Sequence, residues 1–502
     1  MRLFEILLVL TNLLVFLGLV IPRLHALRWT GYLALIALIL VFVQIFVEGS
    51  RWQMAPAYVL AGLFFLIWLL QSILPSVNSL IAVLAAMLGG VSLVVSIVLP
   101  AVLPVFHFPK PTGPYGIGTT TYHWIDQSRP EIFTTKKNVN RELMAQVWYP
   151  AKSDPSSPRA PYIQDIDTVA PALAQQFHFP KFFFNHLKYV TTNAVSSAPV
   201  AEDKPSYPVL IFLSGLEGYR QMNTFQIEEL VSHGYIVVGL DQPGAEAAVQ
   251  FPDGRQILGK PRDEMVRLDL QSVEPQVPAP TLNGVEQPQG LIPYFAEDVS
   301  FALDQLTKVN KSDLNQRLTG RLDLARIGTF GISLGGMNVS QACLKDSRLK
   351  ACLIMDVYIP ADVVKAGLQQ PTMFMTRDAE AMRLERQRSG GWTEKDIALT
   401  IDTMRALYNK SSVDSYYLQI AKTFHLNFTD VPYWSPIASQ IGIAGPVDTQ
   451  HAFDSINAYS VAFFNQYLKN QPSPLLKGPS KQYPEVKIDT HLKKSPENKV
   501  LP

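Results

Sequence analysis

Charge of either sign is scarce in this sequence. Charged residues make up 17% of its 502 residues, and 43 basic against 42 acidic side chains leave a net charge of +1. A chain so close to neutral has no overall field to attract nucleic acid or an acidic protein. We therefore predict that it has no nucleic-acid partner.

Cysteine is scarcer still, with only two in the chain. Cys343 and Cys352 flank a predicted helix-to-strand connection, and neither has a second cysteine at the two-residue spacing of common metal sites. The sequence therefore predicts two buried free thiols, and it offers no metal site built on cysteine.

Apolar residues are abundant: they make up 48% of the chain, and four long runs of them fill the first 106 residues. A helix needs about 20 mostly apolar residues to cross a bilayer. Buried core helices are the alternative. A cleaved signal peptide is a second alternative for the first run, but Glu5 stands where a signal peptide carries basic residues. We predict a transmembrane region of four helices over residues 1–106. The runs cover residues 7–21, 29–47, 55–73 and 80–105.

The side of the membrane is predicted from the basic loops. An even number of spans puts the N-terminus and everything after residue 106 on one side. Arg23 and Arg28 form a compact basic cluster in the first loop, which favours the cytoplasm for that loop. A plain count gives three basic residues on the side of the N-terminus, Arg2, Arg51 and Lys110, against two in the first loop. This count favours the opposite orientation by one charge. We expect a multi-pass cell-membrane protein whose large domain lies outside the cytoplasm.

Beyond the apolar region, strand-like runs alternate with helical patterns. This alternation predicts an α/β fold with a mostly parallel sheet and helices on both faces, with its site beyond the carboxyl ends of the strands. We assign residues 107–470 to this domain, and 471–502 to a polar Pro- and Lys-rich tail that follows the surface or frays. Residues 250–290, rich in Pro, Gly and Gln, are expected to be a functional cover or disordered. The expected strands cover residues 209–213, 235–240, 326–330, 349–355 and 371–376, and the expected helices 225–232, 295–306, 335–344 and 456–468.

The strongest chemical signal is the segment Gly331-Ile332-Ser333-Leu334-Gly335, which matches G-x-S-x-G. It stands between a predicted strand and a predicted helix, as the nucleophile turn of α/β-hydrolases does. The glycines allow a sharp turn that pushes the serine out, and the following helix points its N-terminus at developing negative charge. A plain tight turn is the alternative. We predict that Ser333 is a nucleophile.

A serine hydroxyl needs a base to take its proton. His425 lies downstream of the last predicted strand, which fits the chain order serine, acid, histidine, whereas His451 opens a predicted helix. Two acids are candidates for orienting the imidazole. Asp356 ends one predicted strand and Asp378 follows the next. Their spacing leaves both open.

The negative oxygen formed by serine attack needs two backbone N–H donors. One belongs to the residue after the nucleophile, Leu334. The other is expected from the loop after the earlier strand, which reads SGLEG at 214–218, and Leu216 is best placed there. A plain turn is again the alternative for this loop.

Several segments extend these signals to a family, above all HLNFTD at 425–430, which has the pattern H-x-N-F-x-D. Others are GPYGIG at 113–118, VWYP at 147–150, SGLEGYR at 214–220 and SHGYIV at 232–237. With these segments, residues 113–488 resemble the platelet-activating factor acetylhydrolases of the secreted and type II intracellular kind and their bacterial relatives. The resemblance implies an α/β-hydrolase fold without metal or cofactor. It implies Ser333 as nucleophile, Asp356 as acid, His425 as base, and the main chain of Leu216 and Leu334 as oxyanion donors.

The chain also departs from that family. Its members commonly have S-H-G-L where Leu213-Ser214-Gly215-Leu216 stands here, and a histidine where Ile332 precedes the nucleophile. The animal enzymes of the family lack the four membrane helices. Selectivity for a short acetyl group is therefore not implied.

The expected function is a membrane-anchored serine esterase acting on an acyl ester of lipid or phospholipid type. One alternative is a general carboxylesterase, or a polyester or dienelactone-type hydrolase, on the same scaffold. Another is a membrane receptor or assembly protein with an inactive hydrolase domain. Nothing in the sequence indicates an oligomeric state.

An aromatic cluster at 177–184 contains five phenylalanines interleaved with Lys181. These rings could dip into a lipid interface, or they could line an acyl pocket or close the core. The sequence leaves both roles open.

Overall fold

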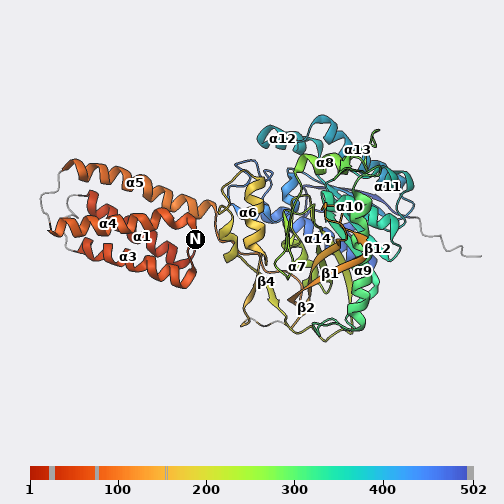
Figure 1. The fold of residues 1–502 in the computed structure, drawn as a ribbon, viewed down its shortest axis with the longest axis horizontal. Coiled ribbons are helices and arrows are strands. Elements are labelled where there is room, and N and C mark those ends of the chain that lie inside the picture. Colours follow the sequence, from red (N-terminus) through yellow and green to blue (C-terminus); the bar gives the residue numbers. More distant parts are fainter. Residues whose placement is uncertain (22–28, 74–78, 153, 155, 494–502) are drawn as a thin grey trace, which may run out of the picture. The chain divides into compact units, whose positions relative to one another are not determined.

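The computed structural model describes residues 1–21, 29–73, 79–152, 154 and 156–493 (Figure 1). The chain forms two compact units. The anchor unit comprises Met1–Phe106, Phe182–Val190 and Trp434–Ile437, and the large unit comprises His107–Lys181, Thr191–Tyr433 and Ala438–Pro502.

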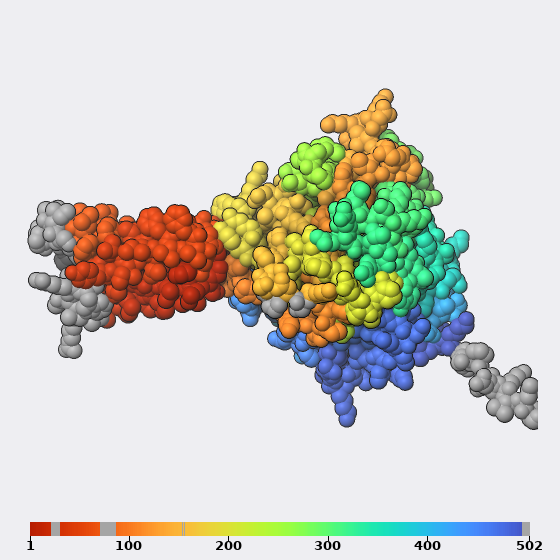
Figure 2. Space-filling model, turned by 90° about the horizontal axis from the view of Figure 1, so that it is seen from below, coloured from red at the N-terminus to blue at the C-terminus, as the bar shows by residue number. Residues whose placement is uncertain are grey.

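Apolar helices lie side by side in the anchor unit (Figure 1, Figure 2). Three segments are long and apolar enough to cross a membrane: Leu3–Val20, Gly31–Glu48 and Trp52–Leu70. The described apolar stretch of the last helix, Met87–Val102, is shorter than such a span. Three of the four predicted spans are therefore found among the described residues, and the fourth stays a prediction. The helices are α1 (Leu3–Val20), α3 (Trp29–Glu48), α4 (Ala55–Ile73) and α5 (Ser79–Val102).

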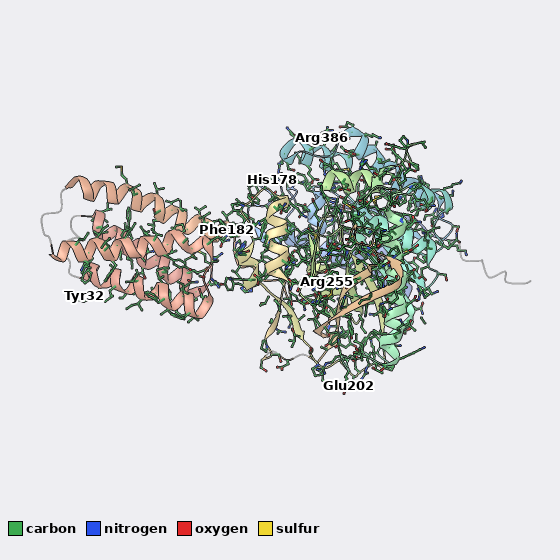
Figure 3. The ribbon with its side chains drawn as sticks, viewed as in Figure 1. Tyr32, His178, Phe182, Glu202, Arg255 and Arg386 are labelled. Atoms are coloured by element: carbon green, nitrogen blue, oxygen red, sulfur yellow. A yellow bond between two sulfur atoms is a disulfide. The ribbon has the colours of Figure 1, made fainter. Side chains whose placement is uncertain are left out.

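Apolar side chains cover the outside of these helices. Phe46 is 85% exposed, and Tyr32, labelled in Figure 3, is 67% exposed. Arg51 instead turns inward and donates to both oxygens of Glu5 at 2.7 Å, with both side chains buried. Apolar side chains on the outside and a buried salt bridge on the inside are what a hydrocarbon environment requires of membrane helices. Arg23 and Arg28, on which the predicted orientation depends, lie outside the described residues.

The segment Phe182–Val190 belongs to the anchor unit. The Trp52 indole donates to the Phe183 carbonyl at 3.0 Å, and its ring meets that of Phe182 at a centroid distance of 5.6 Å. Phe182 is 49% exposed (Figure 3), whereas Phe184 is buried. The position of Phe182 therefore favours the lipid-interface alternative for that ring, and the position of Phe184 favours the core alternative.

The described residues of the large unit contain an eleven-stranded sheet (Figure 1). From β6 to β14 the neighbouring strands run parallel, and β2 and β15 pair antiparallel with the two ends of this parallel part. Further out, β4 pairs parallel with β1. Every residue of β5 is buried, as expected for a parallel strand covered on both faces. The predicted, mostly parallel sheet is therefore confirmed. The strand order is β15-β14-β13-β12-β11-β5-β6-β2-β1-β4-β3. The strands are β1 (Gly116–Pro130), β2 (Asn140–Ala151), β3 (Arg159–Pro161), β4 (Thr191–Ser196), β5 (Tyr207–Leu213), β6 (Ile236–Asp241), β11 (Leu322–Ile332), β12 (Leu349–Met355), β13 (Thr372–Thr376), β14 (Ser415–Ile420) and β15 (Val486–His491).

Helices cover both faces of this sheet. Successive residues of a strand point to opposite faces. In β5, Ile211 packs in the cluster that contains Val299 of α9 and Val339 of α10. Its neighbour Phe212 contacts Phe330, whose ring contacts Phe464 of α14. Helices α9 and α10 therefore lie on one face and α14 on the other. The main helices are α6 (Ile166–Gln176), α7 (Thr224–Ser232), α9 (Ile292–Lys311), α10 (Leu334–Lys345), α11 (Ala361–Ala366), α12 (Ala379–Ser389), α13 (Glu394–Lys410) and α14 (Thr449–Lys469).

Two regions have more regular structure than the sequence indicated. Residues 250–290 are not a disordered stretch: they contain α8 (Arg262–Leu270), and the short strands β7 (Ala248–Gln250), β8 (Gln256–Leu258), β9 (Thr281–Leu282) and β10 (Val285–Glu286) pair within the same region. In the predicted tail, β15 pairs antiparallel with β14. The sheet therefore extends into the segment that we expected to follow the surface or fray, and residues 494–502 lie outside the described residues.

The two cysteines are not free. Cys343 in α10 and Cys352 in β12 form a disulfide, with Cα atoms 6.7 Å apart. The prediction of free thiols was wrong because a helix that returns antiparallel to the next strand brings its last turn level with that strand. The bond joins the helix that follows Ser333 to the strand that precedes Asp356.

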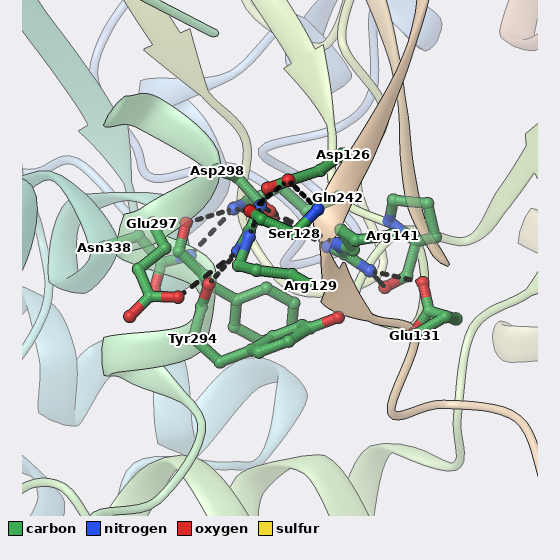
Figure 4. A network of polar contacts seen from close by, with 12 residues as sticks. Asp126, Ser128, Arg129, Glu131, Arg141, Gln242, Tyr294, Glu297, Asp298 and Asn338 are labelled. Atoms are coloured by element: carbon green, nitrogen blue, oxygen red, sulfur yellow. Dashed lines mark hydrogen bonds and ion pairs between the residues drawn. The ribbon is translucent and has the colours of Figure 1, made fainter. Parts of the chain in front are cut away.

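A buried polar network joins β2 to α9 (Figure 4). Asp298 accepts from Arg141 at 2.8 Å and from Arg129 at 2.7 Å. Arg141 also donates to Glu131 at 2.9 Å, and Gln242 donates to Asp298 at 3.0 Å. Burial by itself would raise the pKa of Asp298, but the two guanidinium groups outweigh it and hold that pKa below its usual range. The carboxylate therefore stays charged and paired inside the protein.

We predict that Asp298→Asn lowers the free energy of unfolding by about 3–5 kcal/mol, because the buried guanidinium of Arg141 and the partly buried one of Arg129 would then face a neutral amide. Urea unfolding of the detergent-solubilised chain measures the change. Asp304→Asn on the same helix is the control, since its ion pair with Arg348 lies at the surface and contributes about 0–1 kcal/mol. Equal small losses from the two variants would contradict the role given to the network.

Candidate active site

Ser333 occupies a sharp corner between β11 and α10. Its backbone has φ 57° and ψ −129°, in the left-handed region that costs a non-glycine residue energy. Its N–H donates to the carbonyl of Met355 at 3.0 Å, which fastens the corner to β12. A Cβ at position 335 would lie 2.1 Å from the Leu213 carbonyl oxygen, so only glycine fits there. The turn predicted from G-x-S-x-G is present.

His425 and Asp356 meet although 69 positions separate them. Asp356 directly follows β12, and His425 begins the short 3-10 helix η3 (His425–Phe428). Nδ1 of His425 lies 2.6 Å from Oδ2 of Asp356, and the Thr376 hydroxyl donates to the other carboxylate oxygen at 2.8 Å. With Nδ1 directed at the carboxylate, Nε2 is the ring nitrogen that remains for a serine proton.

The contact between Ser333 and His425 is not closed. In the part of the chain that the structure describes, no hydrogen bond joins the Ser333 hydroxyl to the imidazole. Catalytic hydrogen bonds are often long in a free enzyme and shorten when substrate binds. The histidine–aspartate contact expected of a triad is therefore formed, and Ser333 stands at its corner without a hydrogen bond to His425 among the described residues.

Asp378, the other candidate acid, has a different structural role. It caps the N-terminus of α12, where its side chain accepts the N–H of Ala381 at 2.8 Å. The structure brings Asp356, and not Asp378, to His425. Two acids that looked equivalent by spacing are therefore separated by their positions in the fold.

Arg377 contacts the acid and was missed by sequence analysis. Its Nε lies 2.8 Å from Oδ2 of Asp356, and the guanidinium lies 4.3 Å from the Trp392 ring centroid and pairs with Glu385. Burial alone would raise the pKa of Asp356, but the charge of Arg377 and the hydrogen bond from His425 outweigh it and hold that pKa below its usual range. The available signal was a charged residue directly after a buried strand.

His425 is held from two further sides. The backbone N–H of His425 donates to Glu385 at 3.2 Å, and the Trp392 ring lies 5.1 Å from the imidazole. Because Glu385 and Trp392 also contact Arg377, one cluster fixes both Asp356 and His425. Such packing keeps the imidazole in one orientation before substrate arrives.

The two expected oxyanion donors lie on either side of the corner. Leu334 is the first residue of α10, and Leu216 lies in the loop after β5. Within the described residues, neither amide donates a hydrogen bond to another group of the protein. A Cβ on Gly215 would lie 3.1 Å from Cβ of Ser333, so the loop passes close to the nucleophile. Both amides are thus available to a substrate oxygen.

A buried carboxyl supports that loop. The Ser214 hydroxyl donates to Glu246 at 2.8 Å, and Glu246 is 2% exposed. Burial, with the charge of Asp241 next, raises the pKa of Glu246 well above its usual value. Sequence analysis missed Glu246, because it lies 32 positions from Ser214 and only the fold brings the two together.

The H-x-N-F-x-D pattern now has a structural explanation. Asn427 accepts the N–H of Gly445 at 2.7 Å, and Asp430 accepts the N–H of Thr224, the first residue of α7, at 2.8 Å. These two side chains therefore hold the backbone that presents His425. Only the histidine of the pattern contacts the acid.

The described residues contain no group of three or more His, Cys, Asp or Glu that could hold a metal ion. A cavity of about 390 Å3 lies between α7 and α14, with Phe225, Glu229 and Phe453 in its lining. No triad residue lines it.

Comparison with known proteins agrees with this geometry. The sequence matches the family model described as platelet-activating factor acetylhydrolase, isoform II, over residues 101–274 and 296–475. A platelet-activating factor acetylhydrolase of Cavia porcellus is 23% identical over 414 residues, which cover 77% of this chain and 85% of that protein. A probable 1-alkyl-2-acetylglycerophosphocholine esterase of Arthroderma benhamiae is 24% identical over 406 residues, covering 76% and 93%.

A solved structure points to the same class of fold. The ferulic acid esterase from Streptomyces cinnamoneus aligns with a TM-score of 0.57 at 25% identity, over 77% of this chain and 99% of that chain. The family match includes the serine corner, Asp356 and His425. The chain therefore belongs to the platelet-activating factor acetylhydrolase, isoform II, family.

Proposed function

We propose that this chain is a serine esterase that hydrolyses acyl esters of lipid or phospholipid type through an acyl-enzyme. The observation that carries the proposal is the 2.6 Å contact between His425 and the buried Asp356, together with the strained corner at Ser333. An inactive receptor domain would have no need to maintain a buried acid, an oriented base and a strained serine at once.

The reaction follows from the roles of these groups. The Ser333 hydroxyl attacks the ester carbonyl while Nε2 of His425 takes its proton, and the same nitrogen then gives that proton to the departing alcohol. Amides of Leu216 and Leu334 hold the tetrahedral oxyanion, helped by the N-terminus of α10. Water then attacks the acyl-enzyme by the same route and releases the acid. Asp356 stabilises the imidazolium in both halves.

A lipid substrate is supported by three observations. Relatives that share the family are named platelet-activating factor acetylhydrolase and 1-alkyl-2-acetylglycerophosphocholine esterase. Three apolar helices are long enough to span a bilayer, and Phe182 exposes about half of its surface in the same unit. An enzyme anchored in this way meets esters in the membrane. The likeness to a ferulic acid esterase favours a second candidate, a general carboxylesterase.

We also propose that the large unit lies on the extracytoplasmic side of the cell membrane. The disulfide between Cys343 and Cys352 supports this side, because disulfides persist in oxidising compartments and are rare in the cytosol. In the sequence, the basic residues Arg23 and Arg28 between the first two apolar runs support it as well.

Replacing the nucleophile tests the proposed chemistry. We expect Ser333→Ala to lower the turnover of p-nitrophenyl butyrate by about a million-fold, the loss seen when a triad serine is removed. Ser347→Ala, an exposed serine just beyond α10, is the control and should retain full turnover. Retained hydrolysis in Ser333→Ala would exclude the mechanism.

A comparison of two substrates separates a lipid esterase from a general carboxylesterase. The turnover of short-chain phosphatidylcholine in micelles is measured beside that of p-nitrophenyl butyrate. A lipid esterase should prefer the phospholipid to the simple ester.

The acid can be tested by a matched pair of variants. Asp356→Asn should lower kcat by about 10⁴-fold, because an amide holds the wrong histidine tautomer. Asp378→Asn should retain near-full activity, since asparagine caps a helix about as well as aspartate does. Steady-state kinetics on p-nitrophenyl butyrate measures both, and the opposite ranking would overturn the assignment of the acid.

Membrane sidedness can be tested by thiol labelling in intact cells. A cysteine introduced at the exposed position Glu202, labelled in Figure 3, should react with a membrane-impermeant maleimide without permeabilisation. Cys343 and Cys352 should remain unreactive in the denatured chain until a reductant is added. Labelling of position 202 only after permeabilisation would place the large unit in the cytoplasm.

A further inference from the structure

Helix α8 is fastened at both ends to loops of the candidate active site. At its start, Arg262 pairs with Glu217 at 2.7 Å, and Glu217 directly follows the expected oxyanion donor Leu216. Just beyond its end, the Ser272 carbonyl accepts the N–H of Ala361 at 2.9 Å, in the stretch that follows Asp356. The helix therefore reaches from the loop after β5 to the stretch after β12.

The sheet order determines what lies beneath this helix. β11 lies between β5 and β12, and Ser333 directly follows it. Two strand spacings amount to about 10 Å, and the nine residues of α8 extend about 13 Å. A helix that joins the two flanking loops must therefore cross the carboxyl end of β11. Helix α8 is a cover over the nucleophile.

The inner side of this cover carries one polar group. Met265 and Leu268 of α8 are completely buried, in the same cluster to which Leu216 and Tyr358 contribute partly buried side chains. Asp269, next to Leu268, is only 4% exposed. Within the described residues its carboxyl group makes no hydrogen bond and no ion pair, and its Oδ1 is fully shielded.

A buried carboxyl without a partner is costly. An unsatisfied buried polar group lowers the stability of the fold, and a charged one lowers it further. Burial raises the pKa of Asp269 well above its usual value. An apolar residue of similar size would fit this position at no such cost. The Asp269 carboxyl group on the inner side of α8 is explained if the substrate brings its hydrogen-bond partner.

Tyr358 indicates where that partner would sit. It follows Asp356 by two positions, and after burial itself the charge of Asp269 is the largest influence raising the pKa of its phenol. The N–H of Ala361, three positions after Tyr358, donates to the carbonyl of Ser272, three positions after Asp269, so the fold brings the two stretches together. No hydrogen bond joins the carboxyl group to the phenol in the described chain. A neutral carboxyl group donates and accepts hydrogen bonds, and so does a phenol, so the pair matches a hydroxyl, which also does both.

We infer that Asp269 and Tyr358 form a recognition point, under α8, for a hydroxyl group carried by the ester substrate. The inference rests on the proposed esterase function and adds specificity to it: the preferred esters carry a free hydroxyl on the alcohol or the acyl part close to the scissile bond. A site built to bond a substrate hydroxyl discriminates strongly against the analogue that lacks it, because its own polar groups are then left unpaired.

The test compares esters that differ by one hydroxyl. Ethyl butyrate is the parent, with 2-hydroxyethyl butyrate and ethyl 3-hydroxybutyrate as the two hydroxylated partners, on the full chain in detergent. We expect the wild type to prefer at least one partner by about tenfold or more in kcat/KM, which corresponds to one well-placed hydrogen bond. Asp269→Leu should reduce that preference to about one, and Tyr358→Phe should reduce it in part.

Controls separate recognition from folding. Asp263→Asn alters an exposed acid of the same helix and should keep the wild-type preference. Asp269→Leu removes an unpaired buried carboxyl, so its thermal unfolding midpoint should not fall. A wild type that treats all three esters alike, or a preference that survives Asp269→Leu, would overturn the inference.

Binding without turnover distinguishes this inference from the proposed function. In Ser333→Ala protein, calorimetry should show tighter binding of the preferred hydroxylated ester than of ethyl butyrate, and Asp269→Leu should abolish the difference. Equal binding would overturn the inference whatever the catalytic result. Discrimination in binding, combined with a wild type that hydrolyses none of the esters, would support the recognition point and count against the esterase.

Discussion

A completely buried carboxylate loses its hydration, and Asp356 replaces that hydration from three directions. The imidazole of His425 approaches at 2.6 Å, the Thr376 hydroxyl donates at 2.8 Å, and the Arg377 guanidinium lies at 2.8 Å. Removing one partner of such a buried group leaves the others facing an uncompensated charge. The arrangement requires the ends of β12 and β13 to be adjacent, so the parallel register of these strands is a condition for the site.

The corner at Ser333 depends on the same strand ends. Ser333 adopts a backbone conformation that a free chain would avoid. The hydrogen bond from its N–H to the Met355 carbonyl and the close packing of Gly335 against β5 hold the corner in place. Strain of this kind persists only where the surroundings overdetermine it. The disulfide adds a covalent link between α10 and β12, the two elements whose ends carry serine and acid. Rigid neighbours therefore hold serine and acid in place.

Local signals were sufficient for part of this picture. The corner at Ser333 was predictable because the strained turn demands glycines at fixed offsets. The core strands were predictable because parallel strands buried on both faces read as apolar runs. The choice between Asp356 and Asp378 was not, since both follow strands and only the family resemblance favoured Asp356. Arg377 and Glu246 were missed because their partners lie far away in sequence.

Other misses have different causes. β15 pairs along one edge only and alternates buried with exposed residues, so its sequence looks like a polar tail. α8 is rich in charge and buries only Met265, Leu268 and Asp269, too few for a clear helical stripe. The disulfide depends on where a returning helix lies beside its strand, which the spacing of two cysteines does not state.

The make-up of the anchor unit has a practical and biosynthetic consequence. Besides the first 106 residues it includes Phe182–Val190 and Trp434–Ile437, which the ribosome makes long after the apolar helices have left it. The anchor therefore becomes complete only when most of the chain has been synthesised. A fragment that begins after residue 106 would still carry two segments of the anchor unit, Phe182–Val190 and Trp434–Ile437. We therefore do not expect truncation at this position to give a water-soluble enzyme free of anchor segments.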